Sequence, residues 1–260
     1  MDNDFFAGVE VKETLLSTGT HIWLPVRYYD WSWMNAIFPA PAANVQRLLP
    51  SNKLKPLLLM PGKAMVALTA IEYRHIADIG PYNEFSISVL VQCEPTITIP
   101  GLPVLFNPLL SPQWYKKFGV YICHLPVTTK EAYQFGVEIW GYPKFVAEIS
   151  FEETDQIRRC RLRAEGQEII SLDVKKLATQ ARSISLYSYS VKNSQLLRTL
   201  IQTQGQYGIA TFPGGASYTL GNHPIAEELR ALRMGKTAVG RFYAPLVQSM
   251  LHPACEQLQL

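Results

Sequence analysis

The stretch GVEIWGYPKFVAEI, residues 136–149, places a single lysine among apolar and aromatic side chains. Lys144 follows Trp140 and Tyr142 and directly precedes Phe145. Burial of an unpaired ammonium group costs far more free energy than one hydrogen bond returns. A lysine in this setting therefore either extends its amine to the surface or is held neutral for chemistry.

The chemistry available to such a lysine depends on its neutral form. A free lysine has a pKa near 10.4, so roughly one in a thousand is neutral at pH 7. The neutral amine is the nucleophile that forms a Schiff base with a carbonyl substrate. Lys144 is thus a candidate nucleophile, and an exposed lysine of no catalytic role is the alternative.

Two further segments join this stretch in a common pattern. The spacing G-x-E-x-x-x-Y-P-K covers residues 136–144, GPYNE covers residues 80–84, and HPIA followed by ELR covers residues 223–226 and 228–230. Together they resemble the acetoacetate decarboxylase family, over a span from about Arg27 to Leu246. The resemblance implies a Schiff-base lysine at position 144, pointing into a cone-like β-barrel, in a homo-oligomer.

The same resemblance implies roles for individual residues. Glu84 would orient Lys144 and assist proton transfer, and Arg27 would receive the substrate carboxylate, with bidentate geometry suited to that role. For Glu84 the alternative is an exposed glutamate where a loop meets a strand, and for Arg27 it is a surface or structural ion pair. We expect three aromatic residues beside the site to bind substrate: Tyr82, Trp140 and Tyr142. Glu138 is expected to support the lysine segment structurally.

The chain departs from the family pattern at two positions. Phe145 stands where a second lysine usually follows the nucleophile, which leaves burial as the available means of disfavouring the ammonium form. By spacing from Glu84, the family's other active-site glutamate falls on Thr69, which cannot act as a carboxylate. Glu72 lies three residues later, so in a strand it would point to the opposite face. This departure puts decarboxylation of acetoacetate itself in doubt, whereas Schiff-base formation could survive it.

Composition excludes several other classes of protein. The net charge of +3 is too small, and the basic residues too scattered, to indicate nucleic-acid binding. Arg159, Arg161 and Arg163 would share one solvated face of a strand, with Cys160 on the other. The four cysteines form no CxxC pair and no HExxH is present, so we expect no metal and no cofactor. The acidic start and the absence of a long apolar run indicate a cytoplasmic protein with no membrane segment.

The order of elements indicates one mainly β domain with helices (α+β), covering residues 1–260. Strands are expected at 21–29, 64–73, 84–92, 145–152, 156–164, 167–174, 183–190, 195–203 and 239–251. Helices are expected at 42–49, from Lys130 to about Phe135, and at 224–234 with Asn222 as its cap. Many strands with few helices favour an antiparallel sheet closed into a barrel, with the helices packed outside.

Three functions remain open at this point. The leading hypothesis is a cofactor-free decarboxylase of a short 3-oxo acid, converting acetoacetate to acetone and carbon dioxide through a Schiff base on Lys144. The second is a Schiff-base aldolase or dehydratase acting on a 2-oxo acid. The threonine at position 69 favours this second hypothesis more than the first. The third is a barrel that binds a small apolar carbonyl compound without turnover. In the first two the partner is a small keto acid.

Overall fold

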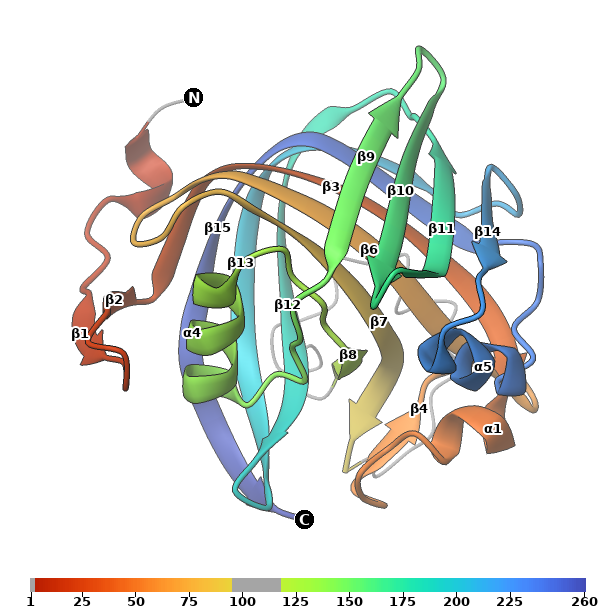
Figure 1. Cartoon of the computed structure of the whole chain (residues 1–260), viewed down its shortest axis with the longest axis horizontal. Coiled ribbons are helices and arrows are strands. Elements are labelled where there is room, and N and C mark those ends of the chain that lie inside the picture. The colour runs from red at the N-terminus through yellow and green to blue at the C-terminus, as the bar shows by residue number, and fades with distance from the viewer. Residues whose placement is uncertain (1–2, 95–117) are drawn as a thin grey trace.

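Seven strands hydrogen-bond to one another in a closed ring in the computed structural model, which describes residues 3–94 and 118–260. Figure 1 shows these long strands curving across the molecule. In ring order they are β7 (Tyr82–Cys93), β8 (Phe118–His124), β12 (Gln180–Lys192), β13 (Gln195–Ala210), β15 (Gly240–Gln259), β3 (Val26–Pro41) and β6 (Lys63–Ile76). Two short strands extend the sheet, β4 (Leu54–Pro56) and β5 (Leu58–Met60), and β1 (Lys12–Leu15) pairs with β2 (His21–Leu24) in a separate hairpin.

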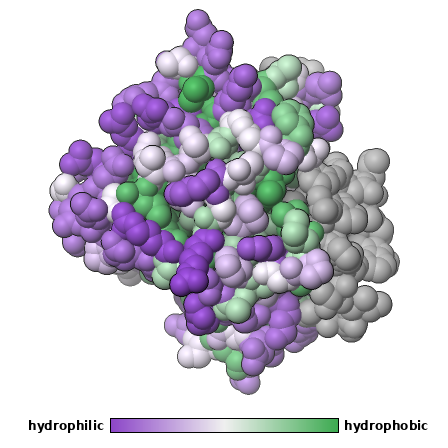
Figure 2. Space-filling model, turned by 90° about the vertical axis from the view of Figure 1, so that its right-hand side faces the viewer, coloured by the Kyte–Doolittle hydropathy of each residue, from purple (hydrophilic) through white to green (hydrophobic). Residues whose placement is uncertain are grey.

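A second sheet of four strands lies against one side of the barrel (Figure 1). Its order is β14 (Ala216–Leu220), β11 (Gln167–Lys175), β10 (Ile157–Ala164) and β9 (Glu148–Glu153). The side chains of β10 alternate as expected: Arg161 and Arg163 point outward, whereas Cys160 and Leu162 are fully buried. The neighbouring face, which carries β14 and α5 (Pro224–Ala231), is mostly hydrophilic, with small separated apolar patches (Figure 2).

The largest apolar core lies between the barrel and this second sheet, outside the barrel. In β7, Phe85 and Ile87 belong to that core, whereas Ser86 and Ser88 face the barrel interior. Strands β6 and β3 follow the same rule, because successive side chains of a strand point to opposite faces. The part of the barrel wall formed by β3, β6 and β7 is therefore buried on both sides, and its interior face is free to carry polar groups.

Within the described residues, three α-helices accompany the sheets. Helix α1 (Ala42–Gln46) and α5 contribute side chains to the core between the sheets, on the outside of the barrel as expected. Helix α4 (Lys130–Trp140) differs, because its Phe135 and Trp140 line the barrel's interior cavity. The short 3-10 helix η1 (Asn3–Phe6) precedes β1. No helix in the described residues is both long and apolar enough to span a membrane.

Most predicted elements are confirmed, with corrections to their ends. Helix α4 continues five residues beyond Phe135 to Trp140, and Gly141 caps it in the left-handed conformation. The cap of α5 is His223, whose Nδ1 accepts from the backbone of Ile225, and not Asn222. Helices α1 and α5 both end three residues earlier than predicted.

The strand predictions also need correction: β8 was not predicted, and β13 and β15 continue beyond their predicted ends at 203 and 251. The expected strand 21–29 is two strands, separated at Pro25, and the second of them continues to Pro41. Residues 145–147 precede β9 and form only an isolated bridge through Val146. The barrel is antiparallel except where β8 and β12 run parallel. The apolar stretch 101–110 lies outside the described residues.

A buried arginine joins the two sheets. Arg158, on β10, is 4% exposed and donates to Ser32 of β3 (2.6 Å) and Glu72 of β6 (2.7 Å). Its guanidinium also lies 4.4 Å from the ring centroid of Phe151 on β9. Because a buried charge is costly without partners, these contacts fix how the second sheet sits on the barrel.

This contact can be tested through stability. Arg158→Ala would remove the buried donor that Ser32 and Glu72 share, and should lower the free energy of unfolding by roughly 2–4 kcal/mol. Arg161→Ala, on the outer face of the same strand, is the matched control and should change it by less than about 0.5 kcal/mol. Urea titrations of the three proteins measure the difference. Equal effects of the two substitutions would contradict the bridging role.

Candidate active site

A cavity of about 160 Å³ lies inside the barrel and holds one buried pair of opposite charges. Lys144 Nζ lies 2.8 Å from Glu84 Oε2, and the two residues are 9% and 6% exposed. These are the only charged residues among the described residues that line the cavity. The other lining residues are apolar, aromatic, hydroxyl-bearing or amide side chains.

Helix α4 and the segment after it position Lys144. After the cap at Gly141, the backbone of residues 142–147 runs beside residues 125–127, joined by three hydrogen bonds: Leu125 N to Pro143 O, Val127 N to Phe145 O, and Ala147 N to Val127 O. Glu84 comes from the third residue of β7, which was expected to lie at a loop–strand junction. The lysine and its carboxylate partner thus belong to different elements, brought together by the fold.

Gly136 provides the space that the lysine occupies. A Cβ atom at this position would lie 2.4 Å from Lys144 Cε and 2.9 Å from Nζ. No side chain can be accommodated there without displacing the amine. The first glycine of the G-x-E-x-x-x-Y-P-K spacing is therefore required by close packing against its lysine.

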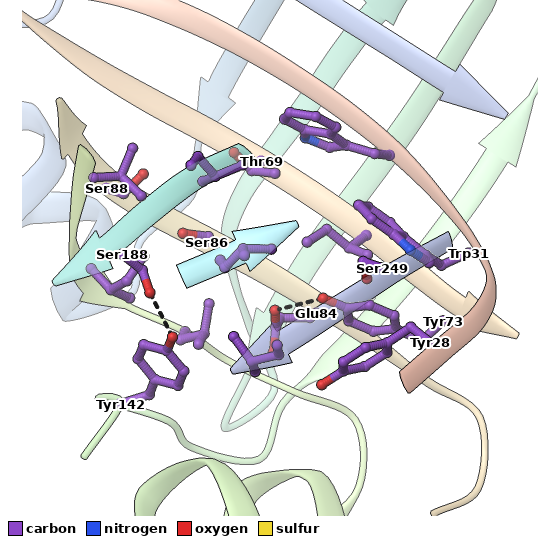
Figure 3. A pocket seen from close by; sticks show the side chains of 18 of the residues that line it. Tyr28, Trp31, Thr69, Tyr73, Glu84, Ser86, Ser88, Tyr142, Ser188 and Ser249 are labelled. Atoms are coloured by element: carbon purple, nitrogen blue, oxygen red, sulfur yellow. Dashed lines mark hydrogen bonds between the residues drawn. The ribbon is translucent and has the colours of Figure 1, made fainter. Parts of the chain in front are cut away.

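Four tyrosines surround Glu84: Tyr28, Tyr82 and Tyr142 are buried, and Tyr73 is half-buried. Tyr73 donates to Glu84 Oε1 at 3.4 Å, and the hydroxyls of Tyr142 and Ser188 lie 2.6 Å apart (Figure 3). Burial is the largest cause that raises the pKa of all four hydroxyls, and the charge of Glu84 raises each further. At neutral pH all four are therefore uncharged hydrogen-bond donors.

Aromatic rings form a continuous wall of the cavity. Each ring centroid lies between 4.7 and 6.4 Å from the next along the series Trp33, Trp31, Tyr73, Tyr82, Phe135, Trp140, Tyr142. Lys144 Nζ lies 5.0 Å from the centroid of Phe135 and 5.4 Å from that of Tyr82. The amine is thus enclosed by rings, with Glu84 as its polar partner.

Five of the six residues expected at the site line this cavity: Lys144, Glu84, Tyr82, Trp140 and Tyr142. Arg27 is not among the lining residues. The expectation that it receives a substrate carboxylate in this cavity is therefore corrected. Its neighbour Tyr28 faces the cavity, and strand alternation directs Arg27 to the opposite face. There the charge of Arg27 lowers the pKa of Asp78, although burial raises that pKa overall.

Thr69 lines the cavity, whereas Glu72 does not. Glu72 instead binds Arg74, Arg158 and Ser32 on the side facing the second sheet. Glu138 is also outside the cavity: its carboxylate accepts from the backbone and hydroxyl of Ser17. It ties the N-terminal hairpin to α4, which agrees with the expected supporting role.

Several cavity residues were missed from the sequence, among them Trp31, Trp33, Asn35, Tyr73 and Phe135. For Trp31, Trp33, Asn35 and Tyr73 the signal was the alternation of β3 and β6, where every second residue faces inward; Phe135 lies on α4. In β3 the two tryptophans at positions 31 and 33 indicate this alternation, but the predicted strand ended at residue 29. No group of three or more potential metal ligands occurs in the described part of the chain.

Comparisons with known proteins agree with this geometry. The sequence model of the acetoacetate decarboxylase (ADC) family matches residues 16–254. An acetoacetate decarboxylase structure from Legionella pneumophila is similar over 90% of this chain and 87% of its own, with TM-score 0.60 and 15% identity. A second acetoacetate decarboxylase structure gives 90% and 89%, TM-score 0.58 and 14% identity.

A third similar structure is the enduracididine biosynthesis enzyme MppR complexed with pyruvate, with TM-score 0.54 and 11% identity over 87% of this chain and 88% of its own. At such low identities these likenesses establish the fold of the barrel. No curated protein matches the chain significantly in sequence.

The role of Gly136 yields a first test of the site. Gly136→Ala should leave the protein folded but displace the Lys144 amine, because a methyl group would occupy its place. We expect trapping of a carbonyl compound on Lys144 by borohydride to fall at least tenfold. Gly80→Ala is the control, since a Cβ there meets nothing within 4 Å. Unchanged trapping in Gly136→Ala would show that the amine does not need this space.

The tyrosines yield a second test, based on pH. Their raised pKa values stabilise the folded state below pH 10, and this stabilisation is lost as pH rises from 10 toward the folded values. The free energy of unfolding should therefore fall between pH 10 and 11, by up to about 1.4 kcal/mol per pH unit for each such tyrosine. Tyr73→Phe should reduce that slope, measured by urea titration. Tyr133→Phe, at an exposed position on α4, is the control.

Proposed function

The chain belongs to the acetoacetate decarboxylase family, and from this premise we propose that it decarboxylates a short 3-oxo acid through a Schiff base on Lys144. The observation that carries the proposal is the buried pair of Lys144 and Glu84 in a cavity lined by aromatic side chains. The 2.8 Å contact is within the reach required of a catalytic acid or base. The simplest substrate is acetoacetate, giving acetone and carbon dioxide.

The first step makes the amine neutral. Lys144 passes a proton to Glu84, which leaves a neutral amine and a carboxylic acid in a site of low polarity. The amine nitrogen attacks the ketone carbon, the C–N bond forms, and the oxygen becomes a hydroxyl group. Glu84 returns its proton to that hydroxyl, which departs as water, and the nitrogen lone pair forms the iminium bond. Glu84 thus ends this stage as a carboxylate.

The second stage breaks the carbon–carbon bond. The electron pair of the bond to the carboxylate forms the C=C bond of an enamine, while the iminium electrons return to nitrogen and carbon dioxide leaves. A proton drawn from solvent and delivered by a buried hydroxyl, for which Tyr73 is placed beside Glu84, adds to the carbon. Water then hydrolyses the iminium and releases the ketone and Lys144.

The size of the cavity supports a short substrate. A cavity of about 160 Å³ is comparable to the roughly 150 Å³ of an apolar protein cavity that holds one benzene molecule. Acetoacetate has about as many non-hydrogen atoms as a benzene ring. The aromatic wall accommodates the apolar end of such a molecule and excludes water from the amine.

A second candidate is a Schiff-base aldolase or dehydratase acting on a 2-oxo acid. Thr69 favours it, because the carboxylate expected there for acetoacetate chemistry is missing. The pyruvate bound to the similarly folded MppR is a 2-oxo acid, which agrees with this candidate. Both reactions begin with the same attack by Lys144 and differ in the bond broken afterwards.

Trapping with borohydride tests both candidates. The protein is mixed with acetoacetate or with pyruvate, reduced, and analysed by intact and peptide mass beside Lys144→Ala. We expect an acetone-derived adduct on Lys144 from acetoacetate, absent in the variant, with carbon dioxide released before reduction. An adduct from pyruvate alone would favour the second candidate. No adduct from either compound on the folded protein would overturn both and favour a binding barrel without turnover.

Glu84→Gln separates proton transfer from packing, because glutamine fills the same space without a carboxylate. We expect the rate of adduct formation to fall by about 10²–10⁴-fold, the range that a positioned acid or base contributes. Glu138→Gln, whose carboxylate binds Ser17 outside the cavity, is the control and should trap at the wild-type rate. A normal rate in Glu84→Gln would remove the proposed role of this carboxylate.

The assembly state is a further expectation from the resemblance. We propose that the enzyme is a homo-oligomer, and family membership supports this. Sedimentation of the purified protein tests it, and a monomer at micromolar concentration would contradict it.

A further inference from the structure

A second arginine is buried outside the barrel, near the start of β15. Arg241 is 5% exposed and lies opposite Ala36 of β3 in the antiparallel register. The next residue, Phe242, lies opposite Asn35, which lines the cavity, whereas Ala36 belongs to the core outside the barrel. Because paired residues share one face of a sheet, Arg241 points away from the cavity. It is therefore separate from the candidate active site.

Arg241 differs from the other buried arginine because it has no carboxylate partner. Among the described residues, Arg158 and Arg241 are the two buried arginines. Arg158 forms an ion pair with Glu72 at 2.7 Å, whereas no aspartate or glutamate of the described residues forms one with Arg241. Burial lowers the pKa of the Arg241 guanidinium, and no neighbouring charge raises it again. An arginine remains protonated in proteins, so the fold buries a positive charge without an opposite charge.

Arg241 contacts a backbone carbonyl and one aromatic ring. Its Nη1 donates to Gly214 O at 2.8 Å, and its guanidinium lies 4.9 Å from the ring centroid of Phe212. Its Nε has no hydrogen-bond partner among the described residues. A carbonyl dipole and a ring attract a cation, but neither carries the negative charge that would neutralise it.

The edge of a guanidinium formed by Nε and Nη2 matches the two oxygens of a carboxylate. Arg159 shows this geometry in the same chain, because its Nε and Nη2 donate to the two oxygens of Asp173, each at 2.7 Å. Such paired bonds are among the strongest hydrogen bonds that proteins form. In Arg241 the bond to Gly214 uses Nη1, which does not belong to this edge.

The loop beside Arg241 is built around the guanidinium. Gly214 and Gly215 both have positive φ angles, 96° and 71°, which glycine adopts at little cost. A Cβ atom at Gly215 would lie 2.4 Å from Cζ and 2.6 Å from Nε of Arg241. The loop backbone therefore lies directly against the guanidinium. Phe212, by contrast, is 60% exposed, so the ring that covers the guanidinium is not held in a core.

We propose that Arg241 binds a small carboxylate outside the barrel, at a site closed by Gly215 on one side and by the Phe212 ring toward solvent. The two carboxylate oxygens accept from Nε and Nη2, and the ring moves aside to admit the ligand. The site lies beside the start of β14, which Figure 1 shows on the side of the molecule away from α4. It is independent of the proposed reaction at Lys144.

The charge at the site decides the class of ligand. Burial is the cause that changes the pKa of Arg241, so no second cation is close enough to act on it. One guanidinium balances the single charge of a monocarboxylate. A doubly charged phosphate would leave one negative charge without a partner beside a buried site. The Phe212 ring offers an apolar surface for the hydrocarbon part of a carboxylic acid.

The test follows the Nε–H signal of Arg241 in the NMR spectrum of the isotope-labelled full-length protein. Phe212→Leu and Phe151→Leu assign the signals of Arg241 and Arg158, because each substitution removes the ring beside one guanidinium. Sodium acetate, compared with sodium chloride at equal ionic strength, should move the Arg241 signal along a saturating curve. The Arg158 signal is the internal control and should not move, because Glu72 already balances that charge.

A glycine substitution tests the geometry of the loop. Gly215→Ala should raise the acetate concentration at half-saturation at least tenfold, because its methyl group displaces the guanidinium. Gly166→Ala is the matched control: its φ angle of 74° imposes the same backbone strain, but a Cβ there meets nothing within 4 Å. Lys144→Ala should bind acetate at Arg241 as the wild type does, since the cavity lies on the other face of the wall.

Three results would overturn the inference. An Arg241 signal that follows ionic strength alone, or that moves without saturation, would leave this residue a purely structural one. Equal movement of the Arg158 signal would show a general effect of acetate. Tighter binding of inorganic phosphate than of acetate would overturn the assignment to carboxylates. If Gly215→Ala fails to fold, the wild-type titration still decides. No carbonyl compound or borohydride is used, so failure here leaves the Schiff-base proposal untouched.

Discussion

Strands β3, β6 and β7 of the barrel wall are buried on both faces, and this constraint decides where polar chemistry can lie. The outward faces of β3, β6 and β7 form the main apolar core with the second sheet. Because that core excludes water from the outer surface of the strands, the inward face does not have to supply an apolar core. It can hold Glu84, hydroxyl groups and an enclosed cavity without loss of the main stabilising contacts.

The position of the lysine depends on this wall. Lys144 comes from outside the ring of strands, on a segment hydrogen-bonded to residues 125–127 after α4. Its amine reaches the cavity only because Gly136 leaves room and Glu84 supplies an opposite charge. Removing either partner of a buried ion pair leaves an uncompensated charge, so each of the two residues favours burial of the other. Helix, segment and barrel are thus coupled at the reacting atom.

Much of the fold could be predicted because strand alternation is a local property. The alternating run in β7 and the arginines of β10 gave both the strands and their faces correctly. The extension of β3 to Pro41 could not be predicted in the same way. Its residues are aromatic or apolar on both faces, so the period-2 contrast that marks a half-buried strand is absent.

Residues of the candidate site could be predicted where they lie in one short motif. Residues that reach the cavity only through the pairing of distant strands could not. Lys144 and Tyr142 lie in one short segment, and Glu84 in another, so spacing found them. Arg27 was expected on the wrong face of its strand. The face on which a residue lies depends on register, and a shift of one position moves it to the opposite face. Tyr73 and Ser86 could not be found by motif, because they reach the cavity only through the pairing of β6 with β7.

The replacement of a carboxylate by Thr69 changes the charge that the cavity can tolerate. Lys144 and Glu84 balance each other, so the described lining residues carry no net charge before substrate enters. A carboxylate at position 69 would add a negative charge to this balance. In the proposed reaction the iminium would face the substrate carboxylate across a site of low polarity. Loss of carbon dioxide would then convert this pair of opposite charges into a neutral enamine, a step that a site of low polarity favours over the solvated reaction.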